Sequence, residues 1–199
     1  MGYNLETIAP GLDEECILQP LGVFACLPPS NFPGMIPFWF IPFAWAVGCT
    51  VVVKPSEVTP LPFTWLAELI QKELQLPPGV LNLVHGSKET VESLIAHPLV
   101  KGVTFVGSTA VGRHVYKLAG EHGKRAIVQA GAKNSMVVMP DADMPTAVEA
   151  CVSSFFGNAG QRCLAGANLM VPNDIRETVV VKLTERARAM RLGYGLDES

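Results

Sequence analysis

The chain has 199 residues, with 15 basic and 18 acidic side chains and a formal net charge of −3. This near-neutral balance argues against a nucleic-acid partner, which would require a clustered basic excess. Apolar residues form 49% of the chain and charged residues 17%, which predicts that some surface is buried against further protein. The length suits one domain, or one domain and part of another.

Five cysteines without a Cys-x-x-Cys pair indicate neither a disulfide framework nor a zinc site, so no metal is expected. A reducing compartment is favoured. The amino-terminal residues lack a cationic start followed by an apolar core, so the chain is not expected to be secreted. The histidines show no ligand spacing and are expected to have structural or solvent-facing roles; they are His85, His97, His114 and His122.

The uncharged stretch from Cys16 to Val53 is long enough to raise the question of a membrane span. Prolines interrupt it repeatedly, and proline breaks the backbone hydrogen bonding that lipid demands. We therefore interpret the stretch as buried core and expect no membrane partner. The interrupting prolines are Pro28, Pro29, Pro33, Pro37 and Pro42.

Residues 1–20 are weakly patterned, and Pro10-Gly11 and the acidic residues Asp13-Glu14-Glu15 are expected to be loop. After them, short apolar runs alternate with segments of helical periodicity. In chain order, the pattern predicts strand 21–27, buried helix 36–48, strand 50–53, helix 61–74, strand 80–84, helix 88–97, strand 102–106, helix 109–119 and strand 126–130. The apolar face of helix 61–74 is assigned to Leu61, Trp65, Leu66, Leu69 and Ile70.

The carboxyl-terminal part continues the alternation, with strand 136–139, helix 144–157, strand 167–171 and an amphipathic helix 174–191. This order of elements predicts an α/β fold with a doubly wound parallel sheet and helices on both faces. Ligands bind such sheets at the carboxyl ends of the strands, where several polar turns fall in this sequence.

The turn Gly107-Ser108 follows a predicted strand and opens a helix, where free N–H groups and the helix dipole can hold a phosphate. A plain N-cap by Ser108 is the simpler alternative. The Gly-x-Gly-x-x-Gly fingerprint is absent from this turn. Lys54 and Glu57 follow another strand and could bind vicinal ribose hydroxyls, although a solvated strand end is the simpler reading. Glu57 beside a ribose would disfavour a 2′-phosphate and so favour NAD over NADP.

Cys163 follows the polar, turn-forming residues Gly160-Gln161-Arg162, which suits a nucleophilic thiolate better than a core position. The alternative is a small buried hydrophobe, which is the expectation for the cysteines at positions 26, 49 and 151. Asn31 lies in the turn Ser30-Asn31-Phe32-Pro33 and could donate its amide N–H to an oxyanion formed at Cys163, or could merely support the turn.

Taken together, five motifs in this order resemble the aldehyde dehydrogenase superfamily: Ser30-Asn31-Phe32-Pro33, Lys54-Pro55-Ser56-Glu57, Phe105-Val106-Gly107-Ser108, Gly131-Ala132-Lys133-Asn134 and Gly160-Gln161-Arg162-Cys163. The resemblance implies that Cys163 is the catalytic thiol and Asn31 the oxyanion donor. It also implies an NAD site formed by Lys54, Glu57, Gly107, Ser108, Ser30 and Phe32. The implied domains are a partial segment 1–20, an NAD-binding domain 21–132 and the beginning of a catalytic domain, 133–199.

Hydrolytic members of the superfamily have Glu-Leu-Gly-Gly-Lys where this chain has Gln129-Ala130-Gly131-Ala132-Lys133. An amide cannot act as the general base that activates water. Gln129 therefore points to the methylmalonate-semialdehyde dehydrogenase branch, whose members oxidise an aldehyde with NAD through a cysteine thioester and pass the acyl group to coenzyme A. Ser135 stands where that branch often has His.

Family members are considerably longer, so the resemblance implies a fragment of an enzyme whose full-length form is a homo-oligomer. The implied compartment is the mitochondrial matrix or the cytoplasm. Two alternatives stay open: a hydrolytic aldehyde dehydrogenase that uses a different base, and an inactive nucleotide-binding or interaction module.

Overall fold

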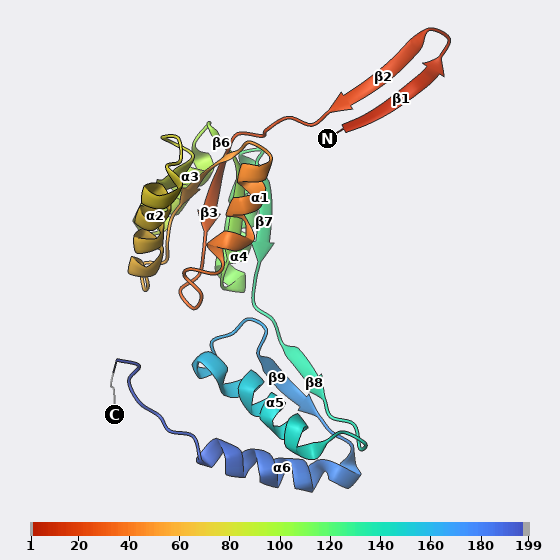
Figure 1. Ribbon diagram of the computed structural model, residues 1–199, viewed down its shortest axis with the longest axis vertical. Helices are drawn as coiled ribbons and strands as arrows, with labels where there is room; N and C mark the ends of the chain where they lie inside the picture. The colour runs from red at the N-terminus through yellow and green to blue at the C-terminus, as the bar shows by residue number, and fades with distance from the viewer. Residues whose placement is uncertain (1, 197–199) are drawn as a thin grey trace. The chain divides into compact units, whose positions relative to one another are not determined.

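The structure, a computed structural model, describes residues 2–196 and divides into two compact units, Met1–Ala130 and Gly131–Ser199. The predicted domain boundary fell after residue 132. Each unit contains a parallel sheet with helices packed against it, so the predicted α/β class is confirmed (Figure 1). None of the helices within residues 2–196 is long and apolar enough to cross a membrane.

The central sheet of the first unit contains five parallel strands in the order β5-β4-β3-β6-β7. From β3 the chain moves outward to β4 and β5, and then returns to place β6 and β7 on the other side of β3. The order therefore reverses between β3 and β6, which is where doubly wound sheets bind ligands. The strands are β3 (Val23–Leu27), β4 (Thr50–Val53), β5 (Leu81–Leu83), β6 (Val100–Val106) and β7 (Arg125–Gln129).

Helices cover both faces of this sheet because successive strand residues point to opposite sides. On one face, Ala25, Leu27 and Val103 pack against α3 (Lys88–Ala96) and α4 (Thr109–Glu121). On the other face, Cys26, Ile41, Val51, Val53 and Phe63 form a second core cluster beneath α1 (Ile41–Ala46) and α2 (Leu61–Leu74). The predicted doubly wound arrangement is confirmed.

The predicted buried helix 36–48 is instead a 3-10 turn, η1 (Pro37–Trp39), followed by the short helix α1. Pro42 lacks the N–H that a continuous helix would need at this point, so the helix restarts there. The expected burial was also partly wrong, since Ile36 and Ile41 are buried but Phe43 and Val47 are 73% and 59% exposed.

The apolar face assigned to α2 was wrong in part. Phe63, which was not assigned, is fully buried, whereas Leu61 and Trp65 are 75% and 64% exposed. The helix carries two apolar stripes, and only the stripe that begins at Phe63 faces the sheet. Periodicity alone could not decide between them.

The predicted loop is confirmed at Pro10-Gly11, which form a turn, but was wrong for Asp13-Glu14-Glu15, which lie in a strand. Strands β1 (Gly2–Ala9) and β2 (Leu12–Ile17) form an antiparallel hairpin whose residues are all exposed. The register shifts between Leu5 and Ala9, where Thr7 has a positive φ of 54° and donates its N–H to Asp13 Oδ1 at 2.7 Å. This bulge disrupts the alternation of apolar residues that would have indicated a strand.

The second unit pairs β8 (Asn134–Val137) with β9 (Gly166–Met170) in parallel. Helices α5 (Met144–Phe156) and α6 (Asn173–Arg188) pack around a small core of Val138, Cys151 and Val179. Asp143 caps α5 by accepting the N–H of Thr146 at 3.0 Å, which lowers the pKa of its carboxyl.

Candidate functional site

A cleft of ≈ 650 Å³ lies in the first unit at the carboxyl ends of β3, β4 and β6, with α3 and α4 forming its far wall. Parallel strands bring their carboxyl ends to one edge of the sheet, so turns that are distant in sequence meet there. Most of the predicted cofactor residues line this cleft, namely Ser30, Lys54, Glu57, Gly107 and Ser108. Phe32, which was also predicted to contact the cofactor, is not among the residues that line this cleft.

Lys54 is fixed rather than solvated. Its side chain is 8% exposed, and its Nζ donates a hydrogen bond to the carbonyl of Gly86 at 2.9 Å. The same nitrogen lies 3.4 Å from Oε1 of Glu57, whose side chain is 59% exposed. The ammonium group is therefore held between the loops that follow β4 and β5. The Glu57 carboxylate stays accessible from the cleft.

The turn between β6 and α4 approaches the cleft with its backbone. A Cβ on Gly107 would lie 2.5 Å from Cζ of Phe105, so a larger residue would require the turn to shift. The N–H of Gly107 already donates to the carbonyl of Gln129 at 3.1 Å, and Ser108 caps α4 by accepting the N–H of Val111 at 3.4 Å. The free donors expected at this turn are therefore those in the first turn of α4.

The wall that α3 and α4 contribute to the cleft combines apolar and polar side chains. Val91 on α3 and Val111 on α4 belong to the lining, as do Glu92 and His114. Nε2 of His114 lies 2.8 Å from Oε1 of Glu92. Glu92 carried no sequence signal, and His114 was assigned only a structural or solvent-facing role. A pair that bridges two helices has no local motif.

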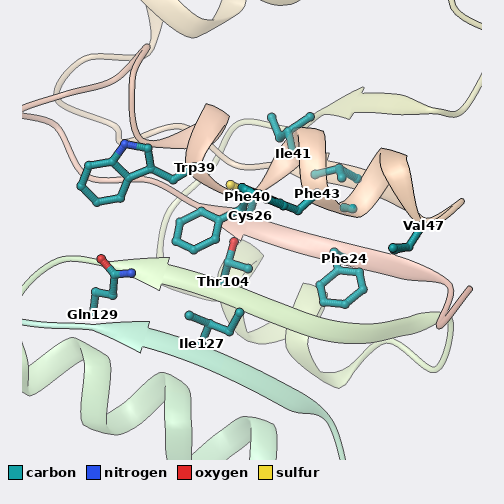
Figure 2. Close-up of a pocket in the computed structure, with 12 residues that line it drawn as sticks. Phe24, Cys26, Trp39, Phe40, Ile41, Phe43, Val47, Thr104, Ile127 and Gln129 are labelled. Carbon is teal, nitrogen blue, oxygen red and sulfur yellow. The ribbon is translucent and has the colours of Figure 1, made fainter. Parts of the chain in front are cut away.

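A second hollow, of ≈ 400 Å³, lies on the other face of the sheet beneath α1 (Figure 2). Its lining is mostly apolar, with Phe24, Ile127 and Val47 among the residues that form it. Gln129 extends into this hollow from the end of β7 (Figure 2) and is not among the residues that line the cleft at the carboxyl ends of β3, β4 and β6. The side chain of Gln129 and the Lys54–Glu57 pair therefore belong to opposite faces of the sheet.

Cys26 forms part of the wall of this hollow and is 2% exposed. Burial raises the pKa of its thiol to about 11. The thiol is therefore protonated at neutral pH and unsuited to nucleophilic attack. Burial also raises the pKa of Cys151, which lies in the core of the second unit. The expectation that Cys26, Cys49 and Cys151 are core residues is confirmed by their burial.

Cys163 lies in the second unit, in the turn between η2 (Gly157–Gly160) and β9, and is half-buried. Its carbonyl accepts a hydrogen bond from Nδ2 of Asn134 at 2.8 Å, and the same amide donates to the carbonyl of Ala165 at 3.1 Å. Asn134 thus ties the Gly131–Asn134 turn to the cysteine turn. This contact explains why two motifs that are distant in sequence occur together.

The backbone before Cys163 is strained, since Asn158 and Ala159 have positive φ angles of 54° and 53°. Asn158 Nδ2 donates to the carbonyl of Gln161 at 3.3 Å, which supports this conformation. Arg162 lies against Gly157, where a Cβ would approach its Cζ to 2.6 Å.

Asn31 lies in the first unit, in the half-buried turn that follows β3. Its role as an oxyanion donor stays a prediction. Ser135 is exposed on β8, and nothing in the structure explains its presence in place of His. No group of His, Cys, Asp and Glu side chains among residues 2–196 is arranged to hold a metal ion.

The first unit is thus a doubly wound α/β domain with a cleft at the switch point where such sheets bind ligands, and it is followed by a unit that carries a cysteine turn. The chain belongs to the aldehyde dehydrogenase family, whose model matches residues 2–199. The resemblance seen in the sequence motifs is thereby confirmed.

Similar proteins include malonate-semialdehyde dehydrogenase 1 of Geobacillus thermodenitrificans, which is 46% identical over 199 residues covering 100% of this chain and 41% of the relative. The crystal structure of methylmalonate-semialdehyde dehydrogenase from Oceanimonas doudoroffii matches with a TM-score of 0.93 at 39% identity, covering 100% of this chain and 41% of that one. A putative methylmalonate-semialdehyde dehydrogenase from Sinorhizobium meliloti, solved in complex with NAD, matches with a TM-score of 0.93 at 41% identity, covering 100% and 40% respectively. The chain thus spans about 41% of the length of the curated relatives it matches.

Proposed function

We propose that this chain supplies the NAD-binding region and the catalytic thiol of a semialdehyde dehydrogenase that transfers its acyl product to coenzyme A. The observation that carries the proposal is the cleft in which the Lys54–Glu57 pair and the Gly107-Ser108 turn lie together. The NAD complex of one relative supports the cofactor, and the names of the relatives support a malonate-semialdehyde type of substrate.

The residues of the cleft fit NAD. The exposed carboxylate of Glu57 can accept hydrogen bonds from vicinal ribose hydroxyls, and it would repel a 2′-phosphate. The first turn of α4 offers N–H groups and the positive end of the helix dipole to a pyrophosphate. When bound, NAD supplies the acceptor for a hydride.

In the proposed reaction, the thiolate of Cys163 adds to the aldehyde carbon and forms a carbon–sulfur bond. The backbone N–H of Cys163 and the amide of Asn31 are the proposed donors to the oxygen that becomes negative. Oxidation of this adduct leaves the acyl group on Sγ of Cys163 as a thioester. For malonate-type substrates, the family resemblance implies that loss of carbon dioxide accompanies the reaction.

Gln129 determines the proposed acyl acceptor. Its amide cannot take a proton from water, so hydrolysis of the Cys163 thioester lacks a general base at this position. The thiolate of coenzyme A needs no such base, because it is itself the nucleophile. It attacks the acyl carbon, and Cys163 leaves as a thiolate ready for another cycle.

The test follows NADH formation from malonate semialdehyde, with and without coenzyme A, in the wild-type chain and in Gln129→Glu. Without coenzyme A, the wild type is expected to form no more than about one NADH per Cys163, because the thioester persists. With coenzyme A it should turn over repeatedly, and Gln129→Glu should turn over without it. Repeated turnover of the wild type without coenzyme A would establish the hydrolytic alternative instead.

The inactive alternative predicts a different result. A chain that binds NAD, forms no NADH and leaves Cys163 slow to react with iodoacetamide would be a nucleotide-binding module without catalysis. The proposed function instead requires Cys163 to be alkylated faster than the buried Cys26, Cys49 and Cys151.

A further inference from the structure

The wall that α3 and α4 contribute to the cleft carries a carboxylate held by neighbouring side chains. Glu92 on α3 and His114 on α4 both line the cleft, and Nε2 of His114 lies 2.8 Å from Oε1 of Glu92. Nζ of Lys88 lies 3.6 Å from the same oxygen. Throughout the described part of the chain, residues 2–196, no hydrogen bond to Oε2 of Glu92 is formed. One carboxylate oxygen is thus anchored and the other is available.

The surroundings of this carboxylate suit a flat heterocycle. Val91 on α3 and Val111 and Val115 on α4 contribute apolar side chains to the same cleft, which Lys54 and Glu57 also line. A purine offers two apolar faces to such walls and a polar edge to a group at their end. An ionised carboxylate accepts hydrogen bonds and donates none, so it distinguishes an edge that donates from one that accepts.

We propose that Glu92 reads the edge of the adenine base, with its free oxygen accepting a hydrogen bond from the 6-amino group. This assignment rests on the proposed NAD-binding function. His114 is a positioning residue, because its Nε2–H donates to Oε1 of Glu92 and holds the carboxylate in the wall of the cleft. The chain should therefore prefer a dinucleotide with a 6-amino purine to the 6-oxo analogue, which presents a carbonyl oxygen to the carboxylate.

The charges around Glu92 favour this role over a simple surface ion pair. Lys88 and Glu92 are half-exposed or exposed helix residues four positions apart, and such a pair contributes little to folding stability. The bond from His114 instead crosses from α4 to α3. It restricts the carboxylate at the point where the two helices border the cleft.

The test measures the Kd of the 199-residue chain for NAD and for nicotinamide hypoxanthine dinucleotide by isothermal titration calorimetry. The wild type is expected to bind NAD about tenfold more tightly, as for a hydrogen bond to a partly exposed charged group. Glu92→Gln should reduce this preference to about twofold or less, because an amide can both accept and donate. Glu121→Gln, at the end of α4 and outside the cleft lining, is the matched control and should keep the full preference.

Two substitutions of His114 test its positioning role. His114→Phe should lose most of the preference while still binding NAD, and His114→Gln, which retains an N–H donor, should restore part of it. Equal Kd values for the two dinucleotides in the wild type would overturn the adenine assignment and leave the proposed function intact. A wild-type chain that bound neither dinucleotide would overturn both. Circular dichroism of each variant separates misfolding from a loss of discrimination.

Discussion

At the scale of single residues, Glu57 is the side chain whose charge should decide between the two nicotinamide dinucleotides. Glu57→Gln removes the negative charge but keeps an acceptor beside the buried Lys54. NAD binding should weaken about tenfold, because a hydrogen bond to a charged acceptor is lost. NADP binding should weaken less or improve, because the 2′-phosphate is no longer repelled. Fluorescence titration with both cofactors measures the change, and an equal loss for both would contradict the assignment. Glu73→Gln on α2 is the control.

Asn134 is the residue on which the cysteine turn depends. Its amide holds the carbonyls of both Cys163 and Ala165. Asn134→Ala should lower the free energy of unfolding by about 1–3 kcal/mol and slow the alkylation of Cys163 relative to Cys16. Asn134→Asp is expected to be worse, because a carboxylate would face two carbonyl oxygens. A reactivity of Cys163 that both substitutions leave unchanged would show that this contact does not shape the turn. Urea unfolding and mass spectrometry give the two readouts.

The buried thiol of Cys26 predicts a pH dependence of stability. Its pKa rises from 9.0 to about 11 on folding, so between these values the unfolded chain loses a proton that the folded chain keeps. This contribution to stability is complete below pH 9 and is lost as the pH rises above it. The free energy of unfolding should therefore fall by about 1 kcal/mol between pH 8 and pH 10 on account of this thiol. Cys26→Ala should remove that part of the decrease, and identical pH profiles would refute it.

At the scale of elements, helix α4 must lie close to β7 to shape the cleft. A Cβ on Gly112 would lie 2.9 Å from Cγ1 of Val128, whereas a Cβ on Gly120 of the same helix would meet nothing within 4 Å. Gly112→Ala should destabilise the chain by about 1–3 kcal/mol and weaken NAD binding. Gly120→Ala should be neutral or stabilise it by about 0.5–1 kcal/mol. Thermal unfolding with and without NAD distinguishes the two, and equal effects would argue against close packing at Gly112.

Helices and strands with one regular spacing of apolar residues were predictable from the sequence. Elements whose apolar spacing is interrupted, or that carry two apolar stripes, were not. Strand β4 and helix α2 have the predicted bounds, Thr50–Val53 and Leu61–Leu74. The face of α2 was misassigned because Trp65 and Phe63 lie on competing apolar stripes, and only tertiary packing selects one. The strands of the β1–β2 hairpin were not predicted, because the bulge near Thr7 shifts the register and interrupts the alternation of apolar residues.

At the scale of the whole molecule, the site was predictable where it depends on topology. Lys54 and Glu57 follow β4, whereas Gly107 and Ser108 follow β6, and the parallel sheet alone is enough to gather the two turns in one cleft. Glu92 and its partner His114 were not predictable in this way. Their contact depends on how two helices face each other, and no spacing within one segment encodes that.

The two compact units have separate hydrophobic cores, so a ligand of the first need not stabilise the second. With NAD at about 100 times its Kd, the first unit should gain about 2.7 kcal/mol of stability. Hydrogen–deuterium exchange should then slow in β3, β4, β6 and α4, and stay unchanged in α6. Glu57→Gln at the same NAD concentration should show a smaller effect. Slowing of similar size in α6 would mean that the two units unfold as one.

The backbone and the side chain of Gln129 have separate structural roles. The carbonyl of Gln129 holds the turn that leads into α4, while its side chain lies on the other face of the sheet (Figure 2). Any amino acid at this position can provide the carbonyl. The identity of the side chain is therefore open to evolutionary change without disturbing the nucleotide turn. On the proposed mechanism, a lineage could exchange water for a thiol acceptor by a single codon change and keep its dinucleotide affinity.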